Sequence, residues 1–420
     1  MSLSRRDLVR GLSGIPLVAA CLAPASGAVA AGGSGASAPD ASAVTLPDTA
    51  GFSFDGTHLN AAYTHPVGVR TRQALDTYTE SRVRDGGRNW PRQNARDAAV
   101  ALYAKLIGAA PGDIAVVPST LEGENLVAAS LDLGPAAGVV TDAFHYDASL
   151  IMYGELHKRG MPLLVMPPRN DRIDYSDLEA MIPQHTKLVA VSLVASATGY
   201  LHDLKTVCDI AHRKGALVYA DIIQAVGAVP LDVKSTGVDF CCAGTYKWLM
   251  GDFGTAFLYV RPDRLRDLKR VQVGWRQIEN YKPHFGPLTS PDPVAGEYEL
   301  GTDTARIFEV STPSWSALAA AAGALQYIEE IGVERIARHR EPLLRRLREE
   351  LPKHGFTPVT PADAQGPYIV FAREGVGQRF RQALTDEKIF VTLYKDKVRV
   401  SASVYNDMAD IDKLIAVLRT

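Results

Sequence analysis

The chain has 420 residues, of which 46% are hydrophobic and 22% charged, and its formal net charge at pH 7 is −2. This composition is typical of a soluble globular protein, and the length predicts at least two domains. Because basic residues are not in excess, the bulk charge gives no indication of nucleic-acid binding.

Residues 1–30 have the pattern of a targeting segment. The basic stretch "SRRDLVR" is followed by the short apolar stretch "GLSGIPLVAACLAPASGAVA", which ends in small residues typical of a cleavage site. The apolar stretch contains Gly14, Pro16 and Pro24 and is too short to span a bilayer. We therefore expect no stable membrane anchor.

The pair Arg5-Arg6 in this setting resembles a twin-arginine signal, although Leu8 stands where Phe is more usual. An ordinary secretory signal is the alternative, since paired arginines are common in such segments. The resemblance implies recognition by the twin-arginine export machinery, cleavage near Ala30 and a periplasmic location. Residues 31–44 then form a flexible linker rich in Gly, Ala and Ser.

From about residue 95, strand-like and helix-like segments alternate. Strands are expected at residues 113–119, 137–144, 162–168, 187–196, 216–222 and at both ends of 240–260. Helices are expected at residues 121–133, 147–160, 174–182 and 203–215, with Gly160 and Gly215 at helix ends. The strands are continuous apolar runs, which indicates a mainly parallel sheet covered by helices on both faces. Residues 45–305 are thus predicted to form a large α/β domain.

Residues 306–420 have a different pattern and are predicted to form a smaller α+β domain. An apolar helix at 313–332 precedes a charged helix at 333–355, whose buried side is expected to hold Ile336, Leu343, Leu344, Leu347 and Leu351. A strand at 367–373, a helix at 377–387, a hairpin-like segment at 389–403 and a helix at 407–420 complete the prediction.

Cys208, Cys241 and Cys242 remain once the targeting segment is removed. Adjacent residues of a strand point to opposite faces, so Cys241 and Cys242 make a poor disulfide pair. The chain has no Cys-x-x-Cys and no His-rich ligand spacing. We therefore expect neither a disulfide framework nor a metal site.

Lys247 lies in the middle of the apolar stretch "FCCAGTYKWLMGDFGTAFLYV" at 240–260. A buried ammonium is costly unless it is paired or neutralised, but desolvation frees the amine to form a Schiff base with an aldehyde. Other polar residues also follow predicted strands, where ligands of parallel sheets bind: Ser119, Thr120, His145, Ser196, Asp221, Gln224 and Tyr246. A carboxylate such as Asp221 can keep a pyridinium nitrogen protonated, and a helix start with Ser119 and Thr120 can hold a phosphate. This combination indicates pyridoxal 5′-phosphate.

The segments "YADIIQAVGAVPLDV" and "VDFCCAGTYKWLMGDFGTAFLYVR" resemble the class V aminotransferases, a family of fold-type I pyridoxal-phosphate enzymes. The family includes cysteine desulfurases, kynureninases and isopenicillin N epimerase-like proteins. The resemblance extends from "HLNAAYTHPVG" to "VRVSASVYN". It implies the fold-type I transferase fold, pyridoxal 5′-phosphate as cofactor and a homodimer.

The resemblance also implies roles for single residues. Lys247 would form the Schiff base and move the Cα proton, Asp221 would pair with the pyridinium nitrogen, and Gln224 would contact the phenolate side. The residues around the ring and the phosphate would be Ser119, Thr120, Tyr246, His145 stacked on the ring, and Ser196, which stands where many relatives have Asn. Thr312 would complete the phosphate site across the dimer interface, and Arg399 would bind a substrate carboxylate.

Each of these residues also has a purely structural interpretation. Ser119 and Thr120 are suited to cap a helix, and Thr312 is suited to cap the helix after it, with Pro313 in its first turn. His145 would be a loop histidine with satisfied hydrogen bonds, and Arg399 a surface arginine on a strand. Asp221 would be a turn residue at a strand end, and Gln224 a surface residue at a helix start. Their joint spacing with Lys247 favours the functional interpretation.

We therefore expect an enzyme that acts on an amino group next to a carboxylate, with transamination favoured. Epimerisation and C–S or other β-elimination share the same first carbanion and stay open, as does a non-catalytic binding protein that keeps the fold. Residues 375–398 contain no cysteine to act as a mobile nucleophile, which argues against a cysteine desulfurase. Periplasmic relatives with this signal and fold tailor peptide siderophores such as pyoverdine, which implies a peptide-linked amino acid, such as a glutamyl group, as substrate.

Overall fold

The computed structural model describes residues 44–283 and 296–419. The predicted targeting segment and residues 31–43 of the predicted linker lie outside the described residues. No helix in the described part of the chain has the length and apolar character needed to cross a bilayer.

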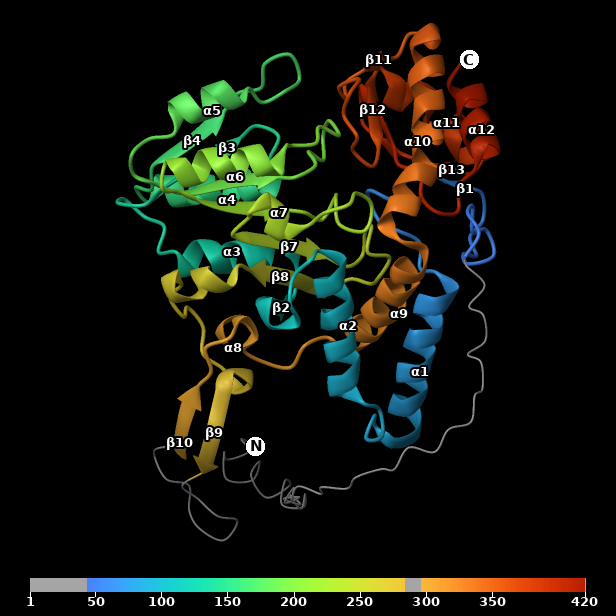
Figure 1. The fold of residues 1–420 in the computed structure, drawn as a ribbon. Coiled ribbons are helices and arrows are strands. Elements are labelled where there is room, and N and C mark those ends of the chain that lie inside the picture. Colours follow the sequence, from blue (N-terminus) through green and yellow to red (C-terminus); the bar gives the residue numbers. More distant parts are fainter. Residues whose placement is uncertain (1–43, 284–295, 420) are drawn as a thin grey trace, which may run out of the picture. The chain divides into compact units, whose positions relative to one another are not determined.

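A seven-stranded sheet forms the centre of the fold, with the strand order β2-β8-β7-β6-β5-β3-β4 (Figure 1). Strand β8 runs antiparallel to both of its neighbours, and every other pair is parallel. The mainly parallel sheet predicted from the apolar runs is therefore confirmed. The strands are β2 (Ile114–Val117), β3 (Gly138–Asp142), β4 (Leu163–Met166), β5 (Thr186–Ser192), β6 (Leu217–Asp221), β7 (Phe240–Gly244) and β8 (Ala256–Val260).

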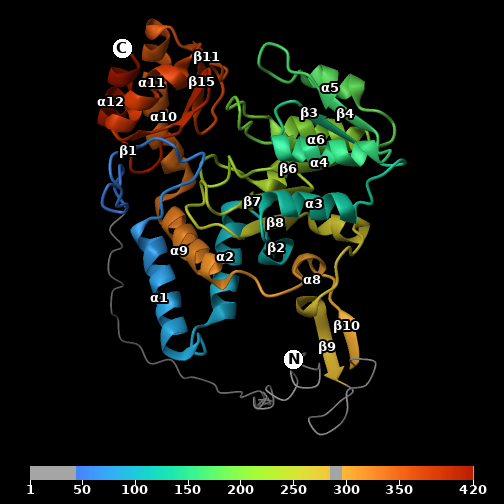
Figure 2. The same cartoon turned by 180° about the vertical axis from the view of Figure 1, so that it is seen from behind.

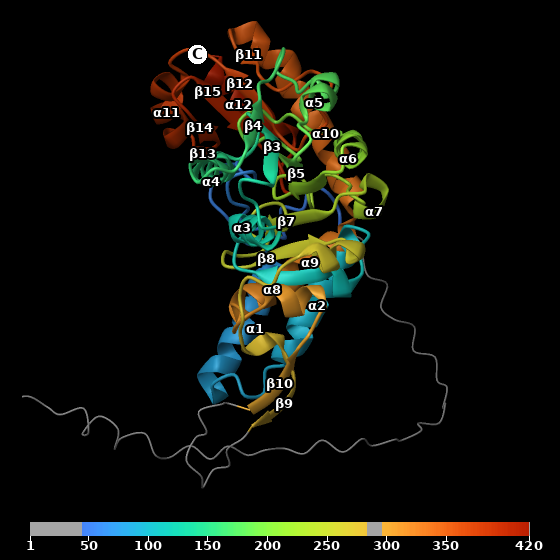
Figure 3. The same ribbon diagram turned by 90° about the vertical axis from the view of Figure 1, so that its left-hand side faces the viewer.

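Helices cover both faces of this sheet, as Figure 3 shows from the side. One face packs against α2 (Arg92–Leu106), α6 (Leu204–Arg213) and α9 (Trp315–Ile331), and the other against α3 (Thr120–Ser130) and α4 (Asp147–Lys158). Each face of the sheet has its own hydrophobic cluster. Cys241 belongs to the cluster on the face of α2, α6 and α9, and its neighbour Cys242 to the cluster on the face of α3 and α4. Together with Cys208 they are buried and have free thiols. The remaining elements around the sheet are η1 (Pro111–Asp113), α5 (Tyr175–Met181), α7 (Val233–Thr236) and η2 (Pro262–Asp267).

Two helices that the sequence did not predict as elements precede the sheet. The helix α1 (Val69–Asp85) lies beside α9, which in turn packs against α2 (Figure 2). Thr71 is the buried residue of α1, so its sequence lacks the apolar stripe that marks a helix. A projecting hairpin and its supports were also missed: η3 (Trp275–Gln277), β9 (Ile278–Pro283), β10 (Gly296–Leu300) and α8 (Thr304–Phe308).

The C-terminal residues build a second hydrophobic core around a four-stranded sheet with the order β11-β12-β15-β14. The helix α10 (Val333–Glu350) spans both cores, because Ile336 packs in the first and Leu343, Leu344 and Leu347 pack in the second. All five predicted core residues of this segment are buried. The other elements are η4 (Leu351–His354), β11 (Thr357–Pro358), β12 (Ile369–Ala372), α11 (Val376–Asp386), β14 (Thr392–Leu393), β15 (Lys397–Val400) and α12 (Met408–Leu418).

An early segment of the chain joins this C-terminal part. Strand β1 (Thr57–His58) pairs in parallel with β13 (Ile389–Phe390), and Asn60 forms a bridge with Ser401. Contacts group Ala43–Thr420 into one compact unit. The predicted division into residues 45–305 and 306–420 therefore stays a prediction.

Candidate active site

The candidate site lies at the edge of the large sheet where its parallel strands end. Ser192 ends β5 and is paired in register with Asp221, which ends β6. His145 follows β3 by three residues and Lys247 follows β7 by three. The sheet thus brings together residues that are up to 102 positions apart in the sequence (247 − 145), as the strand-end argument predicted.

The turn after β7 fixes the backbone around Lys247. The backbone N–H of His65 donates to the carbonyl of Tyr246 (3.0 Å), and that of Thr245 donates to Thr255 (3.1 Å). The Lys247 amine lies 5.6 Å from the centre of the Tyr246 ring and forms no ion pair within the described residues. Burial lowers the pKa of Lys247 to about 8, a shift that Asp221 opposes and Arg399 reinforces. A substantial share of this amine is therefore neutral near physiological pH, which explains a lysine in this apolar stretch.

Asp221 is a buried carboxylate with few partners. Its Oδ1 accepts a hydrogen bond from the backbone N–H of Ile223 (2.9 Å). Burial raises the pKa of Asp221 to about 6, the Ile223 hydrogen bond opposes this, and Glu124 adds to it. A buried carboxylate with a raised pKa is a group that a bound cation would stabilise.

Gln224 and Trp248 join the segment after Asp221 to the segment after Lys247. The Gln224 amide donates to the carbonyl of Ala62 (2.9 Å) and accepts from the Trp248 indole (3.0 Å). Arg340 of α10 lies over the Trp248 ring at 5.4 Å and donates to the carbonyl of Ala228 (2.7 Å). No pattern in the sequence singled out Arg340, since it lies in a helix with many arginines. Gln224 is buried, so its interpretation as an exposed residue at a helix start is wrong.

The start of α3 has the groups expected of a phosphate site. Ser119 caps the helix by accepting from the backbone N–H of Glu122 (3.1 Å), so its capping role is confirmed. The Thr120 hydroxyl accepts from the backbone N–H of Gly244 (2.8 Å), which ties the helix start to the strand before Lys247. A Cβ at Gly244 would lie 3.2 Å from the Tyr246 ring. Glycine at position 244 thus leaves room where the start of α3, the end of β7 and the Tyr246 ring meet.

Arg399 lies on β15 and is buried, so its interpretation as a surface arginine is wrong. It donates to the carbonyl of Ser196 (3.1 Å) and to the hydroxyl of Thr392 (3.0 Å), and lies over the ring of Tyr368 at 5.3 Å. The Nε donor is buried without a partner, and no carboxylate in the described chain pairs with this guanidinium. Ser196 contributes its backbone carbonyl here, and not its hydroxyl.

Thr312 is exposed and lines a cavity of about 350 Å³ together with Pro118, Glu122 and Gly254. The helix that follows is capped by Ser314, whose side chain accepts from the backbone N–H of Ala317. The predicted capping by Thr312 is therefore wrong, and Pro313 precedes the cap. The cavity places Thr312 beside the start of α3.

His145 has partners that the sequence did not identify. Its Nδ1 lies 2.9 Å from the hydroxyl of Ser192, and its Nε2 donates to Glu124 (2.9 Å). Glu124 points inward from the middle of α3 and is almost fully buried. An acidic residue within the otherwise apolar inner face of a predicted helix was the signal that could have revealed it.

These residues fit pyridoxal 5′-phosphate. Lys247 offers a partly neutral amine, Asp221 a buried carboxylate that forms no ion pair within the described residues, and Arg399 a donor without a hydrogen-bond partner. Ser119 and Thr120 stand at the start of an 11-residue helix, where backbone N–H groups favour a phosphate. No group of three or more His, Cys, Asp or Glu suited to a metal ion occurs among the described residues.

Comparisons with known proteins agree with the predicted family and fold. The family model described as Aminotransferase class-V matches residues 92–414. An uncharacterized aminotransferase of Bacillus subtilis, YcbU, is 30% identical over 305 residues, which are 72% of this chain and 78% of the relative. The cysteine desulfurase of Thermococcus onnurineus has a similar structure, with a TM-score of 0.76 and 24% identity over 87% of this chain and 94% of its own. The cystine C–S lyase C-DES, described in complex with cysteine persulfide, gives a TM-score of 0.77 and 21% identity over 87% and 97%.

Proposed function

The chain belongs to the class V aminotransferase family, and we propose that it removes the amino group of an amino acid, free or peptide-linked, by transamination. It has the fold-type I architecture, and its cofactor is pyridoxal 5′-phosphate. When bound, this group supplies an aldehyde that takes up the substrate amine and a ring that withdraws the electron pair left by the departing α-proton.

Arg399 carries the proposal on the substrate side. A buried guanidinium with no acidic partner is costly unless a ligand provides the negative charge, and its Nε donor is free. Arginine binds carboxylates in a bidentate geometry. We therefore assign the α-carboxylate of the substrate to Arg399, whose charge also acts on Lys247.

The remaining steps follow from the protonation states of the described residues. Lys247 supplies the amine that holds the cofactor before substrate arrives, and afterwards its neutral form removes the proton at Cα. Asp221 stabilises positive charge on the ring nitrogen, since that charge compensates its own burial. Gln224 and Trp248 hold the Lys247 turn in place through their mutual hydrogen bond.

Cleavage of a C–S bond is the second candidate, because curated relatives include proteins named cysteine desulfurase. A persulfide carried on this chain is not proposed. Burial raises the pKa of the thiols of Cys208, Cys241 and Cys242, and they belong to packed clusters. A lyase that releases its sulfur product would need none of them.

The experiment that tests the proposal identifies the products. The purified enzyme with pyridoxal 5′-phosphate is incubated with α-amino acids and short peptides, and 2-oxo acid, ammonium, sulfide and D-isomers are measured. Transamination predicts 2-oxo acid without ammonium, and turnover only when an acceptor 2-oxo acid is added. Release of ammonium or sulfide would show that the enzyme catalyses elimination and not transamination. Formation of D-isomers would show that it catalyses epimerisation.

Arg399→Gln is expected to raise KM for carboxylate substrates by roughly 10–100-fold, because hydrogen bonds to charged groups contribute about 1.5–3 kcal/mol. An amine of similar size that lacks the carboxylate is the matched control, and its slow reaction should be equal in both proteins. An equal loss for both compounds would show that Arg399 supports the fold and does not bind the substrate.

We also propose that the chain is exported by the twin-arginine route and acts in the periplasm as a homodimer. The pair Arg5-Arg6 and the small residues near Ala30 support export, and the exposed position of Thr312 leaves it accessible to a second copy. Replacing Arg5 and Arg6 together with lysine should retain the protein in the cytoplasm. Cell fractionation measures where the variant is found. The same amount in the periplasm as for the wild type would contradict the twin-arginine route.

A further inference from the structure

Glu124 has the contacts of an ionised carboxylate. Three side chains donate to it: Ser149 (2.6 Å), Tyr153 (2.8 Å) and His145 Nε2 (2.9 Å). An ionised carboxylate accepts hydrogen bonds through both oxygens and donates none, and bonds of this kind favour the charged form. Glu124 is 1% exposed, so water cannot replace these donors.

His145 is the partner that can balance this charge. Among the ion pairs of the described residues, Glu124 takes part only in the one with His145. Lys247 follows β7 and Arg399 lies on β15, and neither forms an ion pair with Glu124. An isolated buried carboxylate is costly, which favours an imidazolium on His145.

Hydrogen bonding alone permits both protonation states of His145. The Ser192 hydroxyl accepts from the backbone N–H of Tyr146 (3.1 Å), and can either donate to Nδ1 or accept from it at 2.9 Å. The charges around the ring decide between them. Burial lowers the pKa of His145, but Glu124 first, and then Asp221 and Asp142, raise it above its usual value. The pKa of the neighbouring His202 is lowered, by burial first and also by His145.

We propose that Glu124 holds His145 as an imidazolium with both nitrogens occupied, and that Glu124 is thereby a positioning residue of the active site. The ring of His145 is fixed by Glu124 from α3 and Ser192 from β5, with Tyr153 of α4 stacked at 6.2 Å. An imidazolium has no lone pair, so His145 cannot accept the α-proton. That task is left to Lys247. The protonation of His145 does not depend on the proposed function. Only the identity of the ligand that His145 faces rests on that function.

The first test measures the protonation of His145 in the cofactor-free protein. Nitrogen shifts of ¹⁵N-histidine-labelled protein, with His145 assigned by its loss in His145→Gln, should show an imidazolium at pH 7.5. Glu124→Gln should make His145 neutral at that pH, with at least a tenfold lower imidazolium fraction. Glu124→Asp, which keeps the charge, should restore it, and Ser149→Ala, which removes one hydrogen bond but no charge, should leave it protonated.

A neutral His145 in the wild type, or an imidazolium that persists in Glu124→Gln, would overturn the proposal. Because Glu124→Gln could fail to fold, its melting temperature is compared with that of Ser149→Ala. If Glu124→Gln is unfolded, the protonation state of His145 in the wild type and in Glu124→Asp decides the question. These readouts need no cofactor. A failure of the proposed function would appear instead as absent binding of pyridoxal 5′-phosphate with His145 still protonated.

Discussion

Replacing Lys247 with alanine is expected to lower turnover by at least about 10²–10⁴-fold, the contribution typical of a positioned acid–base group. The loss of the amine removes both the covalent hold on the cofactor and the base for the α-proton. Borohydride reduction of the wild type followed by peptide mapping should place the pyridoxyl mass on Lys247. The variant should bind the cofactor without reducible attachment.

The pH dependence of attachment tests the physical state of this lysine. Burial lowers its pKa from 10.5 to about 8, and the neutral amine is the reactive form. The rate of attachment in the cofactor-free protein should therefore rise from pH 6, reach half of its maximum near pH 8 and level off about one pH unit higher. A rate that continues to rise toward pH 10 would show a solvated amine and contradict the assignment.

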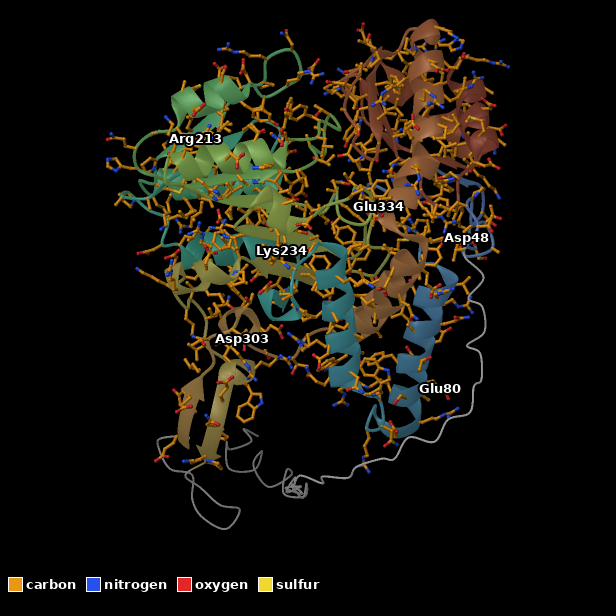
Figure 4. All side chains as sticks on the ribbon, in the orientation of Figure 1. Asp48, Glu80, Arg213, Lys234, Asp303 and Glu334 are labelled. Atoms are coloured by element: carbon orange, nitrogen blue, oxygen red, sulfur yellow. The ribbon has the colours of Figure 1, made fainter. Side chains whose placement is uncertain are left out.

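Lys234 on α7 provides the matched control (Figure 4). It is exposed, so Lys234→Ala should change neither turnover nor cofactor attachment. If Lys247→Ala keeps the activity of Lys234→Ala, the catalytic role of Lys247 is wrong, whatever the family resemblance.

The sequence predicted the part of the fold that follows from burial on both faces. The strands of the large sheet are continuous apolar runs, and a parallel sheet places their ends together, so Asp221, His145 and Lys247 could be assigned to one edge. The missed elements lack this pattern. In α1, Thr71 is the buried residue, and the hairpin of β9 and β10 is mostly exposed, so neither has a periodic apolar signal.

The contacts that tune the site were beyond prediction because they join distant segments. Arg399 reaches Ser196 across 203 positions, and His145 reaches Ser192 across 47. The apolar neighbours of Glu124 in the predicted helix were a signal for its burial, but its partners Ser149 and Tyr153 come from the packing of α3 against α4. Helix caps were read correctly where the residue stands directly before the helix, as for Ser119, and wrongly for Thr312, where Ser314 competes for the position.

Asp221→Asn is expected to have opposite effects on activity and on the stability of the cofactor-free protein. Turnover should fall by about 10²–10³-fold, the order found when one preorganised electrostatic group is removed. In the folded protein the pKa of Asp221 is raised from 3.8 to about 6. The folded state therefore prefers the protonated acid, and stability is lost as the carboxyl ionises between pH 4 and 6. Above pH 6 the variant should melt at the same temperature as the wild type or higher.

Asp239 is the matched control, because it lies before β7, at the opposite end of the strand from Lys247. It is buried but paired with His212 (2.7 Å), Arg264 (2.8 Å) and Arg261 (3.0 Å). Burial opposes these partners, yet they hold the pKa of Asp239 below its usual value. The stability it contributes is present at neutral pH and is lost as pH falls through its folded pKa. Asp239→Asn should therefore lower the melting temperature at pH 7.

The two aspartates thus separate a functional carboxylate from a structural one within one sheet. Thermal unfolding of both cofactor-free variants between pH 4 and 8 should show the melting temperature of Asp221→Asn rising relative to the wild type and that of Asp239→Asn falling. Addition of pyridoxal 5′-phosphate should then stabilise the wild type more than Asp221→Asn, since a cation on the ring compensates the buried carboxylate only where the carboxylate is present. If Asp221→Asn instead loses stability as Asp239→Asn does, the Asp221 carboxylate supports the fold. Its buried negative charge then does not destabilise the cofactor-free protein, as we expect it to.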